Sequence, residues 1–280
     1  MPLPAPDYAY LVLATPRSGS TLLCEALRES GVAGRPLEHF EVLEPTSLPR
    51  QPREYFLGVG DPAILERLAP LEPGARARES SEEWWARIVR EGTGENGVWG
   101  GKLMWRHTQD LLRRARRLEN FAGADLATTL RRLLGDPKLI LVVREDKIAQ
   151  AISLWRAVQT KSWRAGEPAR GALYSFAGID YLRRQLEADE TAWRTWLADY
   201  QLPHHEVRYS ELAANPVGVV DEVLHVLGLS GGAAVEPPLQ RQGDSESVHW
   251  AERYRAERAH AERYQEERAR AERYQEKCAT

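Results

Sequence analysis

A short loop near the N-terminus carries side chains suited to holding an anion. Within six residues it combines an arginine, three hydroxyl groups and a glycine, in the order Pro16-Arg17-Ser18-Gly19-Ser20-Thr21. An arginine supplies a fixed positive charge, hydroxyl groups donate hydrogen bonds, and a glycine lets the backbone close around a ligand. A helix pattern follows, and the N-terminus of a helix attracts anions through its free N–H groups and its dipole. This combination predicts a phosphate or sulfate site.

Two other interpretations of this loop require different residues. A Walker A loop needs a lysine before its serine or threonine, and none precedes Ser20 or Thr21. The loop could also be an ordinary turn in which one serine or threonine caps the helix. A cap needs a single hydroxyl group, so it does not account for an arginine and three hydroxyls in one loop.

A second pair of candidate anion ligands follows the apolar run 138–143. Arg144 stands at the end of this run, and Ser153 lies nine residues further on, inside the next helix pattern. Ligands of open α/β sheets gather at the C-terminal edge of the strands. Arg144 and Ser153 could therefore grip one phosphate together, although Arg144 alone could be an ordinary surface arginine at a strand end.

The elements that must position these residues are short strands alternating with helices. The run 8–14 is apolar at every position, which is typical of a strand buried on both faces. The pattern predicts strands at 8–14, 98–104, 138–143 and 205–209, and helices at 21–30, 81–90, 108–117, 126–134, 147–158, 179–200 and 217–227. We therefore expect an α/β fold with a P-loop-like parallel sheet flanked by helices on both faces. The proline-rich stretch 35–74 predicts a long ordered excursion.

Composition narrows the classes of protein that remain possible. The chain has 280 residues and a formal net charge of −3, so we expect no nucleic-acid partner of the kind that basic proteins bind. Cys24 and Cys278 lie far apart, which argues against a disulfide scaffold and against a metal site. The N-terminus lacks a basic signal-peptide region, and the apolar run is too short for a membrane span. These features predict a cytoplasmic protein.

The C-terminal segment differs from the rest of the chain. Ala-Glu-Arg-Tyr recurs at 251–254, 261–264 and 271–274, a ten-residue repeat. We predict a division into residues 1–248 and a charged helical tail, residues 249–280. A step of ten residues turns each tyrosine by about 80° relative to the last, so no single apolar stripe forms. A solvated single helix fits this pattern, and a partner-binding helix is the alternative.

Several of these residues resemble a known family. The loop from Thr15 to Leu23 resembles the 5′-phosphosulfate loop of sulfotransferases that use 3′-phosphoadenosine 5′-phosphosulfate (PAPS). Arg144 with Ser153 resembles their 3′-phosphate motif. More narrowly, roughly residues 8–255 resemble the Stf0-type sulfotransferases, whose characteristic stretches here are Tyr10–Ala14, Gly31–Gly34, Gln51–Phe56, Gly97–Trp105 and Trp155–Thr160.

The resemblance implies roles in catalysis. The segment Pro36–Phe40 occupies the place of the family's Pro-x-Glu-Phe-Phe, so Glu38 takes the role of general base, with Glu41 as the second candidate. Without the resemblance, Glu38 would be taken for a solvated loop carboxylate. Arg17 would stabilise charge on the leaving phosphate, and Lys102 could reach the sulfate oxygens. Lys102 could equally be a lysine at the edge of the core.

The resemblance also implies ligand contacts elsewhere. A late segment containing Arg241 and Gln242 would close over the nucleotide. The acceptor site would include Glu38, His39, Arg53, Trp105 and Trp155, with Trp99 and Trp163 nearby, and core packing is the alternative for the tryptophans. His39 and the pair Arg106-His107 replace other residues of the family pattern.

The function expected from this resemblance is transfer of a sulfuryl group from PAPS to a hydroxyl of a trehalose-like carbohydrate or glycoside. PAP is then the product, no metal takes part, and the family suggests a homodimer. A phenolic or other small hydroxylated acceptor is the alternative within this class. A P-loop nucleotide kinase and a non-catalytic interaction protein that presents the repeat helix are the alternatives from other classes.

Overall fold

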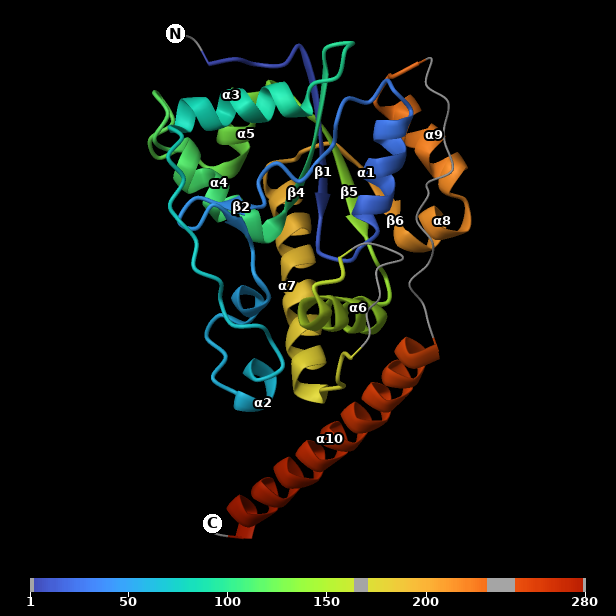
Figure 1. Cartoon of the computed structure of the whole chain (residues 1–280). Coiled ribbons are helices and arrows are strands. Elements are labelled where there is room, and N and C mark those ends of the chain that lie inside the picture. Colours follow the sequence, from blue (N-terminus) through green and yellow to red (C-terminus); the bar gives the residue numbers. More distant parts are fainter. Residues whose placement is uncertain (1–2, 164–170, 231–244, 279–280) are drawn as a thin grey trace.

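The computed structural model describes residues 3–163, 171–230 and 245–278. Its centre is a four-stranded parallel sheet in the order β4-β1-β5-β6 (Figure 1). The strands are β1 (Tyr8–Ala14), β4 (Val98–Met104), β5 (Lys138–Val143) and β6 (His204–Arg208). The predicted α/β class is confirmed, and three of the four strands match the predicted bounds residue for residue.

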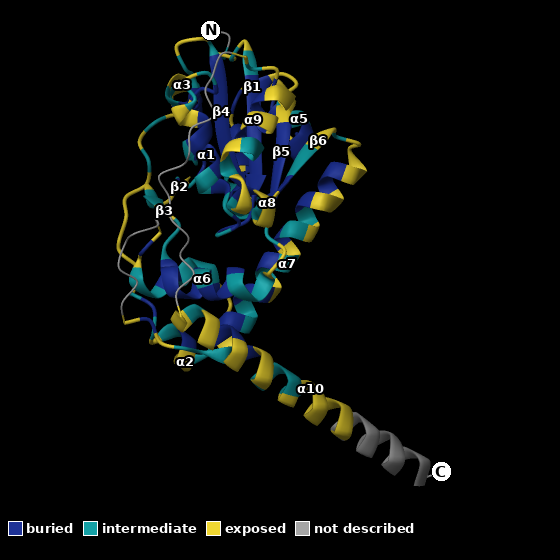
Figure 2. Ribbon diagram, turned by 90° about the vertical axis from the view of Figure 1, so that its right-hand side faces the viewer, coloured by how far each residue is buried: buried dark blue, intermediate teal, exposed yellow. Residues whose placement is uncertain are grey.

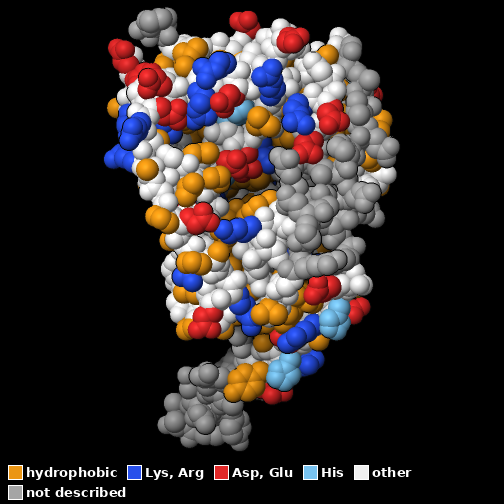
Figure 3. Space-filling model, viewed as in Figure 1, with side chains coloured by type: hydrophobic (Ala, Val, Ile, Leu, Met, Phe, Trp, Pro, Cys, Tyr) orange, Lys and Arg blue, Asp and Glu red, His pale blue; other side chains and the backbone are white. Residues whose placement is uncertain are grey.

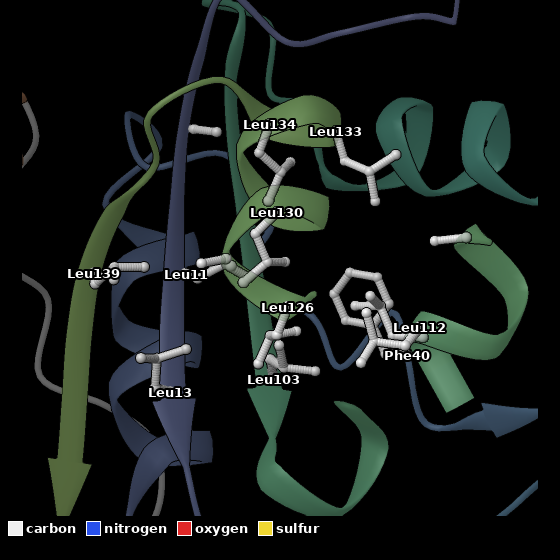
Figure 4. Close-up of a cluster of buried hydrophobic side chains, with 14 of the residues drawn as sticks. Leu11, Leu13, Phe40, Leu103, Leu112, Leu126, Leu130, Leu133, Leu134 and Leu139 are labelled. Carbon is white, nitrogen blue, oxygen red and sulfur yellow. The ribbon is translucent and has the colours of Figure 1, made fainter. Parts of the chain in front are cut away.

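Side chains of β1 alternate between two cores, one on each face of the sheet. Leu11 and Leu13 pack on the face covered by α3 (Ser81–Gly92), α4 (Thr108–Ala115) and α5 (Leu126–Leu134). Figure 4 shows these two residues beside Leu103 of β4, Leu139 of β5 and the leucines of α5. The unbroken apolar character of β1 therefore reflects burial on both faces.

The opposite face of β1 carries Tyr10, Val12 and Ala14. They pack against α1 (Ser20–Glu29), α8 (Tyr209–Ala214) and α9 (Pro216–Val226). Figure 1 shows α1, α8 and α9 on one side of the sheet and α3, α4 and α5 on the other. The helix α8 was not predicted, because six residues are too few to show a helical period.

A third cluster of buried residues lies below the C-terminal ends of the strands. It joins α6 (Lys147–Thr160), α7 (Phe176–Asp199) and the 3₁₀ turn η1 (Pro52–Phe56) to the start of α10 (Ser245–Cys278). Trp250 and Tyr254 of α10 are buried in it, whereas Tyr264, one repeat later, is 63% exposed. Figures 1 and 2 show α10 leaving the body of the molecule beyond this contact.

The excursion 35–74 contains only short regular elements. They are β2 (Val42–Leu43), β3 (Leu48–Pro49), η1 and α2 (Pro62–Leu65), and a further 3₁₀ turn, η2 (Trp105–His107), follows β4. Among the described residues, no helix combines the length and the apolar character needed to cross a membrane.

Candidate functional site

The predicted anion loop joins the end of β1 to the start of α1 and is held from two other helices. Gln150 of α6 donates to Thr15 Oγ1 at 2.9 Å and to the Pro16 carbonyl at 2.7 Å, and all three residues are buried. Trp193 Nε1 of α7 donates to the Ala14 carbonyl at 2.9 Å. The loop therefore keeps its shape through contacts with residues that are far away in the sequence.

Glycine is required at position 19 for two independent reasons. Gly19 has φ +95°, a left-handed conformation that L side chains rarely adopt. A Cβ atom there would also lie 2.6 Å from a ring carbon of Tyr209, the first residue of α8. The loop backbone and the tyrosine ring are therefore in direct contact, with no room for a side chain between them.

The structure brings the predicted 3′-phosphate residues to this loop. Arg17 Nε donates to Ser153 Oγ at 3.0 Å, and Arg144 Nη1 donates to the Arg17 carbonyl at 3.1 Å. The Arg144 guanidinium lies over the ring of Tyr209, 4.4 Å from its centre. Two strands and two helices thus place these cations at one edge of the sheet, as expected for α/β ligand sites.

At the anion loop itself, two buried polar atoms have no hydrogen-bond partner within the described part of the chain. They are Ser18 Oγ in the loop and Arg144 Nε beside it. Buried polar groups are nearly always paired, so a donor hydroxyl and a guanidinium N–H left without a partner fit an anionic ligand. The residues present therefore suit the phosphate groups of a nucleotide such as PAPS.

Glu38, which is partly buried, and Lys102, which is buried, form an ion pair next to the loop. Leu37 pairs with Gly101 as a parallel bridge, and the Lys102 N–H donates to the Leu37 carbonyl at 2.8 Å, so the segment is fixed against β4. Lys102 Nζ is 2.8 Å from Glu38 Oε2 and donates to Thr21 Oγ1 at 3.1 Å. One lysine thus connects the candidate base to the first turn of α1.

Glu38 and Lys102 each stabilise the charged form of the other. Burial opposes ionisation of the Glu38 carboxyl, but the Lys102 ammonium outweighs it and holds the pKa of Glu38 below its ordinary value. Burial likewise disfavours the ammonium, yet the Glu38 carboxylate raises the pKa of Lys102. Both groups are therefore charged at neutral pH, and Glu38 is available as an ionised base.

A second titratable residue faces Glu38 from η2. His107 is buried, and its Nδ1 lies 3.5 Å from Glu38 Oε1. Sequence reasoning noted His107 only as a departure from the family pattern and gave it no role. The one available signal was its position three residues after the buried strand β4, where polar side chains reach the sheet edge.

His39, which was expected to contact the acceptor, is buried in the core. Its Nε2 lies 3.2 Å from the carbonyls of both Arg35 and Gly100, and its ring packs on Trp99 at 5.6 Å. The Glu38 carboxylate reaches Lys102, whereas His39, in the turn that follows, is buried against Trp99. Glu41 lies beyond a turn in which its N–H donates to the Glu38 carbonyl at 3.1 Å.

Two of the proposed tryptophans are core residues. Trp155 is fully buried and its Nε1 donates to the Leu173 carbonyl at 2.9 Å, while Trp99 is fully buried and donates to the Ile88 carbonyl at 3.1 Å. Trp155 was expected to bind the acceptor, but it has no exposed surface to offer it. Arg53 is also otherwise engaged, because it donates to backbone carbonyls at Leu65 and Leu68.

Aromatic surface is available elsewhere near the loop. Trp163 is 36% exposed and stacks on Tyr55 at 5.9 Å, and its carbonyl accepts a hydrogen bond from Arg17. Trp105 is partly buried and meets Trp193 edge to face at 4.8 Å. Trp163 and Tyr55 therefore offer an aromatic face close to a loop arginine.

Sequence reasoning missed a set of charged residues around Tyr55. Arg106 Nε is 2.6 Å from Asp189 Oδ2, its Cζ lies 5.7 Å from the centre of the Tyr55 ring, and Arg50 Nη2 is 3.3 Å from Asp110 Oδ2. Burial raises the pKa of the Tyr55 hydroxyl, and the Glu38 charge raises it further. In the view of Figure 1, the surface of the molecule is hollowed at mid-height, with acidic, basic and hydrophobic side chains around the hollow (Figure 3).

Two expectations concern other parts of the chain. Arg241 and Gln242, predicted to close over the nucleotide, lie outside the described residues. Within the ranges that the structure describes, no group of three or more His, Cys, Asp or Glu side chains is arranged to hold a metal ion.

Comparisons with known proteins give a consistent result. A sequence model of the Stf0 sulphotransferase family matches residues 9–257. The chain is 42% identical over 252 residues to a trehalose 2-sulfotransferase of Mycobacterium tuberculosis (strain ATCC 35801 / TMC 107 / Erdman), covering 89% of this chain and 94% of that protein. It is 44% identical over 253 residues to a trehalose 2-sulfotransferase of Mycolicibacterium smegmatis, covering 89% and 95%.

A comparison of structures gives a more distant match. The sulfotransferase domain from the Synechococcus PCC 7002 olefin synthase aligns with a TM-score of 0.38 and 20% sequence identity, covering 90% of this chain and 88% of that domain.

Proposed function

The chain belongs to the Stf0 sulphotransferase family and is an enzyme that transfers sulfuryl groups, and from this premise we propose its donor, acceptor class and general base. The donor is PAPS, the acceptor is a hydroxyl group of a trehalose-like carbohydrate, and Glu38 is the general base. The observation that carries this proposal is the chain of contacts from Glu38 through Lys102 to Thr21 of the anion loop. It links a partly buried carboxylate to the place where an anionic donor would bind.

The donor side of the proposal depends on the cations and orphaned atoms of the loop. Arg144 stands at the end of β5. Its buried Nε and the buried Oγ of Ser18 both lack a hydrogen-bond partner among the described residues. Arg17 and Ser153 are already bonded to each other beside them. Arg144 and Ser153 would hold the 3′-phosphate, and the loop N–H groups with Arg17 would hold the 5′-phosphosulfate.

The chemistry asks this chain to hold charge and to take one proton. PAPS, when bound, supplies an activated sulfuryl group on a phosphate that leaves as PAP. Arg17 and the N-terminus of α1 stabilise the negative charge that develops toward the leaving phosphate. Glu38 accepts the proton of the attacking hydroxyl, a contribution of about 10²–10⁴ in rate for a well-placed general base. Lys102 keeps Glu38 ionised and, from its place beside Thr21, would be the cation next to the sulfate oxygens.

The acceptor class is supported by the two mycobacterial relatives, whose names state trehalose. The stacked pair of Trp163 and Tyr55 offers an aromatic face of the kind that sugar rings pack against. The charged residues Arg50, Arg106 and Asp189 lie around the same tyrosine. Carbohydrate hydroxyls both donate and accept hydrogen bonds, so they suit a surface that carries both signs of charge.

The experiment is an acceptor screen with the full-length protein and PAPS. Trehalose, other disaccharides, simple glycosides and a phenol are incubated in parallel, and products are detected by mass spectrometry as an added SO₃. The Glu38→Gln protein is the matched control for sulfation that does not come from this site. We expect a disaccharide to be sulfated in preference to the phenol. Preferred sulfation of the phenol would overturn the acceptor class, and equal affinity for PAP and ADP in calorimetry would overturn the donor.

A further inference from the structure

A buried histidine faces the carboxylate of Glu38 without a hydrogen bond between them. His107 Nδ1 lies 3.5 Å from Glu38 Oε1, and it has no hydrogen-bond partner within the described ranges. The other oxygen of this carboxylate is 2.8 Å from Lys102 Nζ. One oxygen of Glu38 is thus held by an ammonium group, while the other faces an imidazole nitrogen across a gap longer than the roughly 2.7–3.2 Å usual for N–H···O bonds.

The gap fits a neutral imidazole whose Nδ1 carries no proton. A neutral imidazole carries its proton on one ring nitrogen and a lone pair on the other. With the proton on Nε2, the lone pair of Nδ1 faces a lone pair of the Glu38 carboxylate, and two acceptors cannot bond. A single proton placed between His107 and Glu38 would convert their contact into a hydrogen bond. The two side chains are therefore arranged to receive one proton.

We propose that His107 is the proton-accepting partner of Glu38 during sulfuryl transfer, a role that rests on the proposed function of this site. The acceptor hydroxyl gives its proton to Glu38 Oε1 while its oxygen bonds to the sulfur of the sulfuryl group. The bond from that sulfur to the bridging oxygen of PAPS breaks, and its electron pair leaves with PAP.

Glu38 then passes the proton to His107 Nδ1, which leaves an imidazolium next to a restored carboxylate. The imidazolium returns its proton to solvent when the products leave. His107 does not touch the substrate in this scheme. It acts on the reaction only through Glu38, whose proton it accepts.

Charged groups on several elements set the resting state of the His107 ring. Burial lowers its pKa below the ordinary value, although the Glu38 carboxylate acts in the opposite direction. Arg50, before η1, and Lys102, on β4, also disfavour the imidazolium, whereas Asp110 on α4 favours it. Their sum keeps the ring neutral at neutral pH, so it can accept a proton when Glu38 has one to give.

A titration by NMR tests this pair without any turnover. The full-length protein is labelled with ¹⁵N at histidine, saturated with PAP and titrated, with the His107→Gln spectrum used for assignment. We expect the wild-type His107 proton to reside on Nε2, and the Glu38→Gln substitution to lower the pKa of His107 because a neighbouring negative charge is lost. A proton on Nδ1, or a pKa that Glu38→Gln leaves unchanged, would overturn the proposal.

Steady-state kinetics supply the second arm. His107→Gln keeps a polar side chain but removes the basic nitrogen, so kcat should fall by about 10- to 100-fold with the KM for PAPS unchanged. In the wild type, activity should fall as the pH drops through the pKa of His107, because an imidazolium cannot accept the proton. In His107→Gln this acidic limb should move to lower pH, toward the titration of Glu38 itself.

A matched control variant completes the test, and one outcome separates failure of the relay from failure of the proposed function. His205→Gln changes a histidine on β6 that pairs with Glu222, and it should leave kcat and the pH profile unchanged. A wild-type kcat in His107→Gln, or an acidic limb that does not move, would overturn the relay. If the wild type transfers no sulfuryl group to any acceptor, the proposed function fails, while the NMR titration still decides whether the buried pair shares a proton.

Discussion

At the scale of single residues, the chemistry of the site is set by how one carboxylate is surrounded. Glu38 is paired with Lys102 at 2.8 Å, and this ammonium keeps its pKa low despite burial. A low pKa guarantees an ionised base at neutral pH, but it also makes that base weaker. In the proposed relay, the imidazole of His107 on the other side of the carboxylate compensates for this weakness, because it offers a second place for the proton.

The proposed role of Glu38 as general base leads to a direct prediction. Glu38→Gln keeps an amide oxygen for Lys102 but removes the proton acceptor, so kcat should fall by about two to four orders of magnitude. Affinity for PAP in calorimetry should stay at the wild-type value, because the anion loop and Arg144 are unchanged. Glu41→Gln is the matched control and should have a much smaller effect. A near-normal rate in Glu38→Gln together with an inactive Glu41→Gln would show that Glu41, and not Glu38, is the general base.

Arg144 leads to a prediction about nucleotide recognition. Arg144→Ala should weaken binding of PAPS far more than binding of adenosine 5′-phosphosulfate, which lacks the 3′-phosphate. The lost charge-assisted contact should cost roughly 1.5–3 kcal/mol, and calorimetry with both nucleotides measures it. Arg131→Ala, which removes an arginine of α5 with a 63% exposed side chain, is the control. Equal losses for the two nucleotides would show that Arg144 does not recognise the 3′-phosphate.

At the scale of elements, the site depends on the contact between the start of α1 and the start of α8. Gly19 precedes α1, and the ring of Tyr209 at the start of α8 occupies the space that a side chain at position 19 would need. The same ring lies under the Arg144 guanidinium. A six-residue helix therefore sets the position of both halves of the proposed nucleotide site.

This contact predicts different results for two glycines with similar backbones. Gly19 and Gly31 both have positive φ, so alanine at either position should cost roughly 1–2 kcal/mol of folding stability. A Cβ at Gly19 would also meet Tyr209 at 2.6 Å, whereas a Cβ at Gly31 has no neighbour within 4 Å among the described atoms. Gly19→Ala should therefore lose PAP affinity by roughly tenfold or more, equivalent to about 1.4 kcal/mol, while Gly31→Ala keeps it. Calorimetry measures both, and equal affinities would show that the loop tolerates the displacement.

At the scale of the whole molecule, the first repeat of α10 belongs to the folded body. Tyr254 is fully buried, its hydroxyl donates to Asp180 at 2.5 Å, and it accepts from Arg183 Nε at 2.9 Å. The family match also runs to residue 257, three residues past this tyrosine. Tyr264 stands at the same position of the next repeat and is 63% exposed. The sequence analysis assigned all three repeats to one charged tail. The structure instead buries the tyrosine of the first repeat and exposes that of the second.

The two tyrosines predict opposite effects on stability. Tyr254→Ala should destabilise the protein by about 3–5 kcal/mol, the range for truncating a buried aromatic side chain. Tyr264→Ala should change the free energy of unfolding by less than about 0.5 kcal/mol. Urea denaturation followed by tryptophan fluorescence measures both, since Trp250 lies in the same buried cluster. Equal effects would mean that the first repeat does not dock on α6 and α7.

The sequence alone determined the framework of this protein. Continuous apolar runs identified β1 and β5, because a strand buried on both faces leaves this local pattern. The anion loop was visible because an arginine, a glycine and three hydroxyls follow β1 directly, and Arg144 because it ends β5. The resemblance to the Stf0 family then pointed to Glu38. Each of these signals lies within a short stretch of sequence, so it can be recognised without knowledge of the tertiary structure.

The tertiary structure decided which side chains meet. Glu38 and His39 are neighbours in the sequence, but Glu38 faces the site and His39 lies in the core. His107 is 69 positions from Glu38 in the sequence, yet the two side chains are adjacent. The same Ala-Glu-Arg-Tyr motif also occurs in two environments, with Tyr254 buried and Tyr264 exposed. Burial and pairing depend on the elements that pack on each residue, and those elements come from distant parts of the chain. Local patterns fix the elements, whereas long-range packing selects the partners of each side chain.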